Sequence, residues 1–342
     1  MKLQVFLYAL WGFLWAGYFA LDGFDFGVGA LFAILGRSSA ERRLMLNSIG
    51  PVWNGNEVWL IGAGAITFAA FPAAYAGIFS SFYLLFVALA AALILRGVVF
   101  EFRGGIERAG WTRAWDAAFV AGSVVSAFIF GVIFGNIFRG LVLGSRGFEG
   151  SFFTFFNPYS LLTGVLFLVL FAWHGAGWLA LKTGGGMQRK AERAAGAGWF
   201  AALLAAAAFA VYTAYDTRMF DNFVNHPGWW LLPALLLASL LAGGWFRLRR
   251  RALAAFLASG LTVALTVCFG VVGLYPNLLP SSGDPAGSIT IAGAAASDYA
   301  LWLVAGLLVI FLPLIIVYQL WVYGLFRSRL LEEEVAADED AY

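Results

Sequence analysis

The sequence predicts an all-α integral membrane protein with nine transmembrane helices, arranged as two four-helix bundles plus one additional helix. Of the 342 residues, 62% are hydrophobic and only 12% are charged, which is too apolar a balance for a water-exposed surface of this size. The apolar residues form stretches of about 20, the length that crosses a bilayer. Polar or turn-rich segments separate nine such stretches.

The predicted spans follow one another with short connections. They lie near residues 4–35, 49–71, 75–98, 117–138, 160–181, 196–215, 228–246, 252–275 and 298–325. The first stretch contains Asp22 and Asp25 and extends to Leu35, so we expect a retained helix and not a cleaved signal peptide. The uncharged run from Val58 to Leu95 is too long for one span, so residues 71–75 are expected to turn a hairpin.

A weak internal repeat underlies the expected division into two bundles. Phe19-Ala20 with Gly23 is echoed 152 positions later by Phe171-Ala172 with Gly175. The expected units are a first bundle at 1–140, an outer loop at 141–159, a second bundle at 160–275, an outer loop at 276–297, a ninth helix at 298–326 and a tail at 327–342.

The basic residues predict the orientation of the chain. All but four of the 21 Lys and Arg residues follow odd-numbered spans, the exceptions being Lys2, Arg139, Arg146 and Arg218. By the positive-inside rule, the N-terminus is expected outside and the C-terminus in the cytoplasm of a bacterial inner membrane. The basic residues are then topological signals and indicate no nucleic-acid partner. The acidic residues from Glu332 to Asp340 suit a solvated tail.

Carboxyl groups inside predicted spans are the first functional candidates, because each costs roughly 2.5–3.5 kcal/mol on insertion scales. Asp22 and Asp25 lie three residues apart on the first helix, and Gly23 and Gly27 are expected to allow a close helix approach that shields them from lipid. Glu57 lies on the second helix. Antiparallel packing of these two helices would bring Glu57 and Asp25 to similar depth.

Further polar residues are expected to join these acids from the cytoplasmic side. The complete set is Asp22, Asp25, Trp53, Asn54, Glu57, Arg96, Glu101 and Asp116. Together they would form a hydrated, charge-paired column of the kind that conducts protons. The alternative is a buried ion-pair network that only holds the first four helices in register.

The histidine count argues against haem binding by this chain alone. Only His174 and His226 are present, and three of the four methionines, Met45, Met187 and Met219, fall in predicted loops. The chain therefore does not present two haem ligands from facing helices. His174 is expected to be a hydrogen-bonded packing residue, with a site role as the less favoured alternative. A lone Cys268 predicts neither a disulfide nor a thiolate metal site, and no catalytic residue is predicted.

Several motifs in the first half resemble subunit II of the cytochrome bd-type quinol oxidases. The resemblance rests on Asp22-Gly23-Phe24-Asp25-Phe26-Gly27-Val28-Gly29, Glu41-Arg42-Arg43, Asn47-Ser48-Ile49-Gly50-Pro51-Val52-Trp53, Gly55-Asn56-Glu57-Val58-Trp59-Leu60, Arg96-Gly97, Glu101-Phe102-Arg103, Trp115-Asp116, His174-Gly175-Ala176 and Leu181-Lys182-Thr183. The second half matches mainly in helix count and length.

The resemblance implies a subunit of an enzyme complex that oxidises membrane quinol and reduces dioxygen to water. Haems b and d would then belong to the partner, subunit I, and this chain would hold no metal or haem itself. The resemblance is also compatible with a structural quinone bound by this chain and with a small single-helix accessory subunit in the complex. The family often has Asp where this chain has Asn54, so Glu57 is the candidate to replace that acid. A proton-coupled transporter that acts without a haem-bearing partner is the alternative function.

Overall fold

The computed structural model describes residues 1–106, 108–144 and 147–337. Arg146 and the end of the predicted tail, residues 338–342, lie outside the described residues. The elements in chain order are α1 (Lys2–Leu35), α2 (Ser39–Ile49), α3 (Trp53–Ala70), α4 (Pro72–Ser81), α5 (Tyr83–Phe102), α6 (Ala109–Arg139), β1 (Leu143–Gly144), β2 (Gly147–Phe148), η1 (Phe152–Phe156), α7 (Pro158–Lys182), α8 (Gly185–Asp216), α9 (Asp221–Asn225), η2 (Pro227–Trp230), α10 (Leu231–Leu248), α11 (Ala252–Leu274), β3 (Asn277–Leu279), η3 (Pro285–Gly287), β4 (Ile289–Thr290), α12 (Asp298–Leu325) and α13 (Glu332–Ala337).

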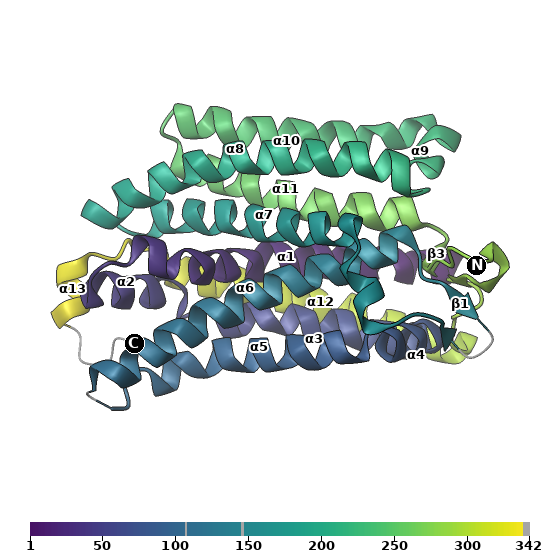
Figure 1. Ribbon diagram of the computed structural model, residues 1–342, viewed down its shortest axis with the longest axis horizontal. Coiled ribbons are helices and arrows are strands. Elements are labelled where there is room, and N and C mark those ends of the chain that lie inside the picture. Colours follow the sequence, from purple (N-terminus) through teal and green to yellow (C-terminus); the bar gives the residue numbers. More distant parts are fainter. Residues whose placement is uncertain (107, 145–146, 338–342) are drawn as a thin grey trace.

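The long helices lie roughly parallel or antiparallel to one another along the longest axis of the molecule (Figure 1). α7, α8, α10 and α11 form the upper part of this view, and α3, α5 and α6 lie in the lower part. α1 lies between the two groups and contacts α3, α6, α7 and α11. The two groups therefore share one core, and the division into separate units at 1–140 and 160–275 stays a prediction.

The number of membrane-spanning helices agrees with the expected nine. Within the described residues, eight helices are long and apolar enough to cross a membrane, counting η2 with α10 as one segment. The ninth is the bent pair α3 and α4, whose axes differ by 119°. α12 has the most exposed surface of these helices, with only 11% of its most apolar window buried inside the chain. Its large apolar side chains are thus available to lipid or to a partner.

The predicted break at residues 71–75 is present, but it does not form a simple hairpin. The chain bends at Phe71, continues as α4 to Ser81, and begins α5 only at Tyr83. Pro72 favours this arrangement, because proline is tolerated in the first turn of a helix and not in its interior. The third span therefore starts at Tyr83, later than the expected residue 75, and it runs on to Phe102.

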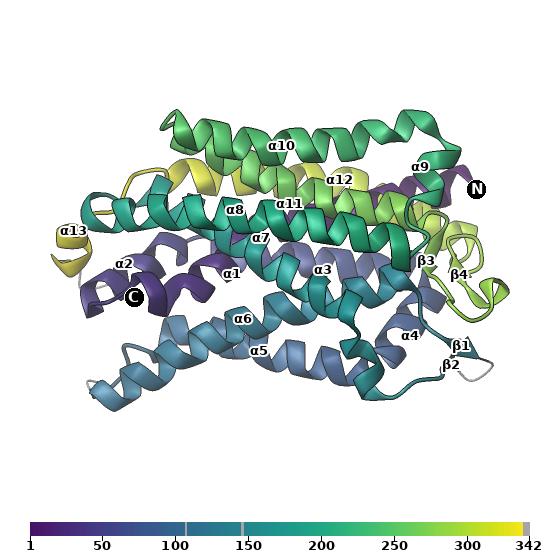
Figure 2. The same ribbon diagram turned by 45° about the horizontal axis from the view of Figure 1, so that its top comes forward.

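The short helix α2 was not expected from hydropathy. Ser38 and Glu41 form a capping box at its start, in which the Ser38 hydroxyl accepts from the Glu41 amide and the Glu41 carboxylate accepts from the Ser38 amide. This pairing satisfies two backbone N–H groups that the first turn of a helix leaves free. α2 lies at the end of the bundle where α13 also lies (Figure 2).

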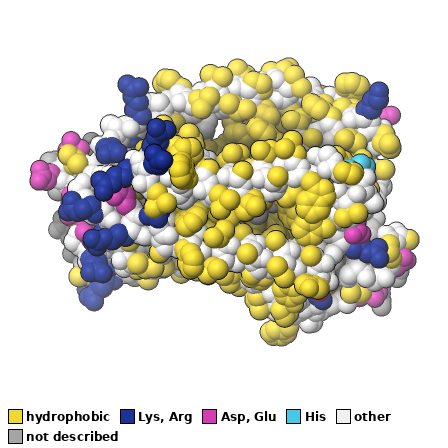
Figure 3. Space-filling model, turned by 90° about the horizontal axis from the view of Figure 1, so that it is seen from above, with side chains coloured by type: hydrophobic (Ala, Val, Ile, Leu, Met, Phe, Trp, Pro, Cys, Tyr) yellow, Lys and Arg dark blue, Asp and Glu magenta, His cyan; other side chains and the backbone are white. Residues whose placement is uncertain are grey.

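Charge separates the two ends of the molecule. Lys and Arg side chains gather at the end that carries α2 and α13, which we call the basic end, and few lie at the other (Figure 3). The N-terminus, α4, α9 and the strands β1 and β3 lie at the opposite end. Both expected outer loops, which contain the hairpins β1–β2 and β3–β4, are therefore on the N-terminal side. The apolar surface between the two ends fits the hydrocarbon layer of a membrane.

Two glycines allow α1 and α7 to touch through their backbones. A Cβ atom on Gly27 would lie 1.8 Å from the carbonyl oxygen of Phe171, and one on Gly175 would lie 2.5 Å from the backbone of Gly27. The expected close approach at Gly23 and Gly27 is present, but it does not cover the acids. Its partner is α7, whereas Asp22 and Asp25 are bonded to residues of α3 and α5.

Candidate functional site

Arg96 is the centre of a buried cluster where α1, α3 and α5 meet. Its side chain is 2% exposed, and its Nη1 and Nη2 donate to Oδ1 and Oδ2 of Asp22 at 2.8 and 2.9 Å. Nη2 also donates to Oε1 of Glu57 at 2.5 Å. The guanidinium carbon lies 4.1 Å from the ring centre of Phe26. One cation thus pairs with carboxylates from two helices, in a geometry that favours arginine over lysine.

Close helix packing holds the backbone of Arg96 in place. A Cβ atom on Gly122 of α6 would lie 2.6 Å from the carbonyl oxygen of Ala92 and 3.0 Å from the amide nitrogen of Arg96. A larger residue at this position would push α5 and α6 apart. The absence of a side chain at Gly122 therefore helps to fix the depth of Arg96 relative to Asp22.

Asp25 is paired with an amide. Its Oδ2 accepts from Nδ2 of Asn56 at 2.8 Å, and its side chain is buried. Oδ1 of Asn56 accepts in turn from Nε2 of Gln319 at 2.7 Å and from the hydroxyl of Tyr323 at 2.8 Å. The acid on α1 is thereby linked through α3 to α12, the ninth spanning helix.

Asp116 belongs to a second cluster, nearer the basic end. It accepts from Nη1 of Arg42 at 2.6 Å and from Nε of Arg103 at 2.7 Å. Arg103 caps the C-terminal end of α5, seven residues after Arg96, which corresponds to two helical turns or about 10 Å. The predicted polar column is therefore divided into two ion-pair clusters at different depths.

The other predicted site residues lie at the margin of these clusters. Trp53 is half-buried and stacks on Phe100, with ring centres 4.9 Å apart. Asn54 and Glu101 are exposed, so the structure does not bring them into the buried network that the sequence predicted for them. For Asn54 the reason is helical phase, because its neighbour Asn56 occupies the inward-facing side of α3.

His174 is a fully bonded packing residue on α7. Its Nδ1 lies 2.7 Å from the Ser259 hydroxyl on α11, and its Nε2 lies 3.0 Å from the Ala20 carbonyl on α1. The ring also stacks on Phe256, with ring centres 4.5 Å apart. Since a carbonyl oxygen only accepts, Nε2 carries a proton. Both ring nitrogens are engaged, which leaves no free lone pair for an iron atom.

Sequence reasoning missed part of the network. The predicted site residues do not include Asn56, Gln319 and Tyr323. Nor do they include Arg42 and Arg103, the partners of Asp116, although Asn56, Arg42 and Arg103 all lie in motifs that resemble the family. A polar residue within an apolar span was the available signal for Gln319. Its proximity to Asn56, 263 positions away in the chain, becomes apparent only in the folded structure.

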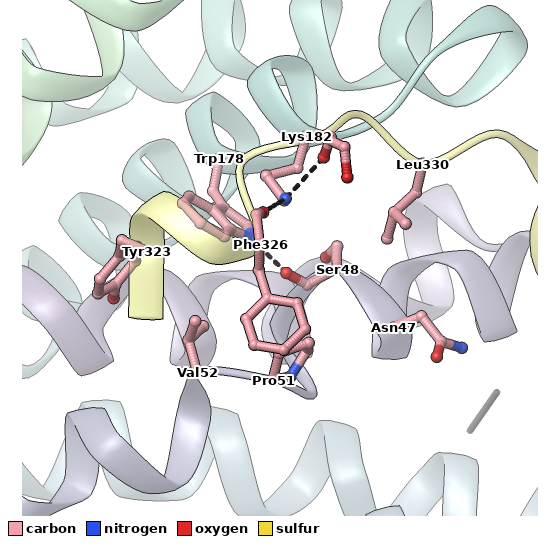
Figure 4. Close-up of a pocket in the computed structure, with 10 residues that line it drawn as sticks. Asn47, Ser48, Pro51, Val52, Trp178, Lys182, Tyr323, Phe326 and Leu330 are labelled. Atoms are coloured by element: carbon pink, nitrogen blue, oxygen red, sulfur yellow. Dashed lines mark hydrogen bonds between the residues drawn. The ribbon is translucent and has the colours of Figure 1, made fainter. Parts of the chain in front are cut away.

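The segment after α12 is attached to the basic end of α7. Nζ of Lys182 donates to the carbonyl oxygens of Phe326 and Ser328, and Leu330 pairs in parallel with Thr183. Figure 4 shows Lys182, Trp178, Ser48 and Tyr323 around a small pocket of about 40 Å³ between α2, α7 and this segment. Trp178 donates to the carbonyl oxygen of Ser48 across it at 3.1 Å. These contacts fix the end of α12 from which Tyr323 projects.

The fold and the cluster define a polytopic α-helical membrane protein with ionisable side chains bonded to one another between its spans. In such proteins, buried charges mark ion or proton pathways or the helix contacts that support them. More specifically, the chain belongs to the cytochrome bd terminal oxidase subunit II family, whose model matches residues 3–326. This confirms the resemblance and extends it to the second half of the chain.

Relatives match over almost the whole length. The chain is 36% identical to the cytochrome bd ubiquinol oxidase subunit 2 of Bacillus subtilis strain 168, covering 94% of this chain and 95% of the relative. It is 32% identical to the cytochrome bd-I ubiquinol oxidase subunit 2 of Escherichia coli K12, with 95% and 94% covered. A chain in the structure of bd oxidase from Geobacillus thermodenitrificans has the same fold, with a TM-score of 0.76, 19% identity and coverage of 95% and 99%.

Proposed function

We propose that this chain is the haem-free second subunit of a quinol oxidase complex that reduces dioxygen to water, and that it supports a haem-bearing subunit I. Family membership over nearly the full chain supports the activity of the complex. The observation that carries the role of this chain is the bonding of Asp22 and Glu57 to one buried arginine, Arg96.

The histidines support the assignment of the haems to the partner. Both ring nitrogens of His174 are engaged. His226 is exposed at the N-terminal end, where it stacks on Trp229. The described residues thus place no pair of histidines on facing spans, and the donor set of this chain does not fit a doubly ligated haem.

The position of Glu57 supports a protein partner on α3. Its side chain is 27% exposed, although it lies within a spanning helix. The same stripe of α3 carries Ile61 and Phe68, which are 70% and 62% exposed. A carboxylate in contact with acyl chains is costly, and a second membrane subunit covering this stripe would remove that contact. We therefore assign this face of α3 to the interface with subunit I.

The two ion-pair clusters support a proton path from the basic end. Asp116 with Arg42 and Arg103 would form its outer part, and Glu57, Asp22 and Asp25 around Arg96 its inner part. About two helical turns separate the parts, so water would have to connect them. In the alternative, a structural network, the same ion pairs only stabilise the packing of α1, α3, α5 and α6.

Replacement of Glu57 by Gln tests this path in the assembled complex. We expect quinol-dependent oxygen uptake and proton uptake both to fall by at least tenfold, while haem content stays unchanged. Glu101→Gln is the matched control, because Glu101 is exposed at the end of α5. Unchanged turnover in Glu57→Gln would remove Glu57 from the mechanism. A lower yield of complexes that remain fully active would instead favour the structural network.

An apolar groove at the N-terminal end suits a structural quinone. Its volume is about 580 Å³, and α1, α10 and α11 line it. Its lining includes polar groups of His226, Trp229 and Tyr275 beside apolar side chains such as Val5 and Leu235. A quinone combines an isoprenoid tail with a polar ring, which fits this distribution. Ala9 also lines the groove, so Ala9→Phe is expected to reduce the quinone that co-purifies with the complex.

The charge asymmetry supports an inner-membrane location with the basic end in the cytoplasm and the N-terminus outside (Figure 3). A membrane lipid environment follows from the apolar surface between the two ends. A small single-helix subunit could pack against the exposed apolar side chains of α12.

A proton-coupled transporter acting alone is the second candidate function, since it would also require buried acids. It predicts activity without any haem-bearing subunit.

A further inference from the structure

We infer that Asp25 holds a proton in the resting protein, and that Asn56, held by Gln319 and Tyr323 of α12, fixes the orientation of its carboxyl group. The inference rests on the proposed proton path, because it states which carboxyl group of that path stores the proton. In this arrangement α12, the ninth spanning helix, positions the Asp25 carboxyl group of α1.

The first support is the balance of charge. Asp22, Asp25 and Glu57 lie close together, and the ion pairs recorded for them within the described part of the chain are made by one cation, Arg96. Three carboxylates against one guanidinium would leave two uncompensated negative charges between spanning helices. Because an unpaired buried charge is costly, a carboxyl group in such a place takes up a proton instead.

The hydrogen bonds indicate which of the three is neutral. Asp22 accepts two bonds from Arg96, and Glu57 accepts one and is partly exposed. Asp25 is 1% exposed and accepts from the uncharged amide of Asn56, and no donor group among the described residues bonds to its Oδ1. Asp25 therefore gains the least from ionisation, and it is the member of the cluster that bears the proton.

The orientation of Asn56 is set by its surroundings. Its Nδ2 faces the carbonyl oxygen of Leu21 at 3.3 Å as well as Oδ2 of Asp25. Since a carbonyl oxygen cannot donate, the group facing Leu21 must be the amide NH₂. Its Oδ1 then accepts from Gln319 and Tyr323. With Oδ2 of Asp25 occupied by a donor, the acid proton resides on Oδ1.

The charged and titratable groups next to Asp25 are Asp22 on α1, Arg96 on α5 and Tyr323 on α12. Glu57 on α3 and Tyr18 on α1 lie one step further away, beside Asp22 and Arg96. Arg96 is already bonded to Asp22 and Glu57, so its charge is largely compensated at the position of Asp25. The Tyr323 hydroxyl donates to Asn56 and not to Asp25, so it supplies no charge that would favour an ionised Asp25.

Infrared difference spectroscopy of the assembled oxidase complex tests the inference directly, because only a protonated carboxyl group has the carboxylic-acid carbonyl band. Wild-type minus Asp25→Asn spectra at neutral pH are expected to show one such band, which shifts in heavy water. If the difference spectrum shows a lost carboxylate band instead, Asp25 is ionised and the inference is wrong.

Tyr323→Phe tests the positioning role and keeps the inference testable if Asp25→Asn does not assemble. Loss of the Tyr323 hydroxyl weakens the hold on Asn56, so the frequency of the Asp25 band is expected to shift. Tyr318→Phe on the same helix is the matched control, because Tyr318 is 59% exposed and makes no recorded hydrogen bond to the network. An unshifted band in Tyr323→Phe, or an equal shift in Tyr318→Phe, would contradict the positioning role.

These measurements are independent of the test of the proposed function. Glu57→Gln reports on turnover and proton uptake, whereas the infrared band reports on the protonation of Asp25. Normal turnover in Glu57→Gln together with an acid band from Asp25 would leave the proton site in place without the path. Impaired turnover together with a carboxylate band would support the path and overturn the proton site.

Discussion

Arg96 and Asp22 form a two-pronged ion pair in which each terminal guanidinium nitrogen donates to its own carboxylate oxygen, at 2.8 and 2.9 Å. Their side chains are 2% and 0% exposed. A pair this well matched offsets much of the cost of burying both charges, but the loss of either partner leaves the other unpaired in a medium that solvates it poorly.

Asp22→Ala is therefore expected to lower the free energy of unfolding of the purified complex by about 3–5 kcal/mol. Thermal unfolding followed by circular dichroism measures the change. Asp216→Ala is the control, because the Asp216 and Arg139 pair lies at the surface and such pairs contribute about 0.2–1 kcal/mol. If the two substitutions lowered the free energy of unfolding equally, the buried Arg96–Asp22 pair would stabilise the protein no more than a surface pair does.

Gly27→Val is expected to prevent normal assembly of α1 against α7. The new Cβ would lie 1.8 Å from the Phe171 carbonyl oxygen, and backbone can move away only if the helices separate. Membrane yield of the complex measures the effect. Gly64→Ala on α3 is the control, because a Cβ there meets no atom within 4 Å. A normal yield of Gly27→Val would contradict the close contact.

Lys182→Met is expected to release the segment that follows α12. The ammonium group of Lys182 donates to two carbonyl oxygens there. Methionine has a side chain of similar length but no hydrogen-bond donor. Limited proteolysis should cut after Leu325 at least several-fold faster in this variant. Arg189→Met, which removes an exposed cation from the same end, should leave the rate of cleavage unchanged.

Glu41 gives a pH-dependent contribution at the basic end. Burial tends to raise the pKa of Glu41, but hydrogen bonds from Lys190 and from the amides of Arg37 and Ser38 outweigh it and lower the pKa. A lowered pKa stabilises the folded state above the unfolded pKa of about 4.3, and this stabilisation disappears as pH falls through the folded value.

Glu41→Gln should therefore cost about 1 kcal/mol at pH 7 and progressively less below about pH 4. Thermal unfolding of the complex across this range measures the difference. Glu332→Gln, at an exposed position on α13, should show little difference at any of these pH values. A cost for Glu41→Gln that stays constant down to acid pH would contradict the role of the ionised carboxylate.

Hydropathy was sufficient for the number of spans, because the bilayer sets a fixed length that each helix must meet. It could not predict α2, which lies at the end of the bundle and depends on the capping box of Ser38 and Glu41. Nor could it predict α4, where Pro72 starts a new helix in an apolar run. α2 depends on capping hydrogen bonds and α4 on the backbone geometry of proline, and hydropathy measures neither.

For the candidate site, the cost of buried charge indicated Asp22, Asp25, Glu57 and Arg96. Asp22 and Glu57 pair with Arg96, and Asp25 is bonded to Asn56; the functional role of these residues stays a prediction. The same argument did not separate Asp116 into a cluster of its own, because depth along a helix is known from sequence only to within a turn. It also could not choose Asn56 over Asn54, since two residues on a helix differ by about 200° in direction and the inward direction is set by the neighbouring helices.

The most direct test asks whether a partner subunit, and not this chain, binds the haems. It is the visible absorption spectrum of the protein after purification in mild detergent through a tag on this chain. We expect haem absorption together with a second large polypeptide, and we expect the same chain produced without that polypeptide to show no haem absorption. Haem retained by the chain alone, or quinol oxidase activity in a preparation free of any partner, would contradict the proposal.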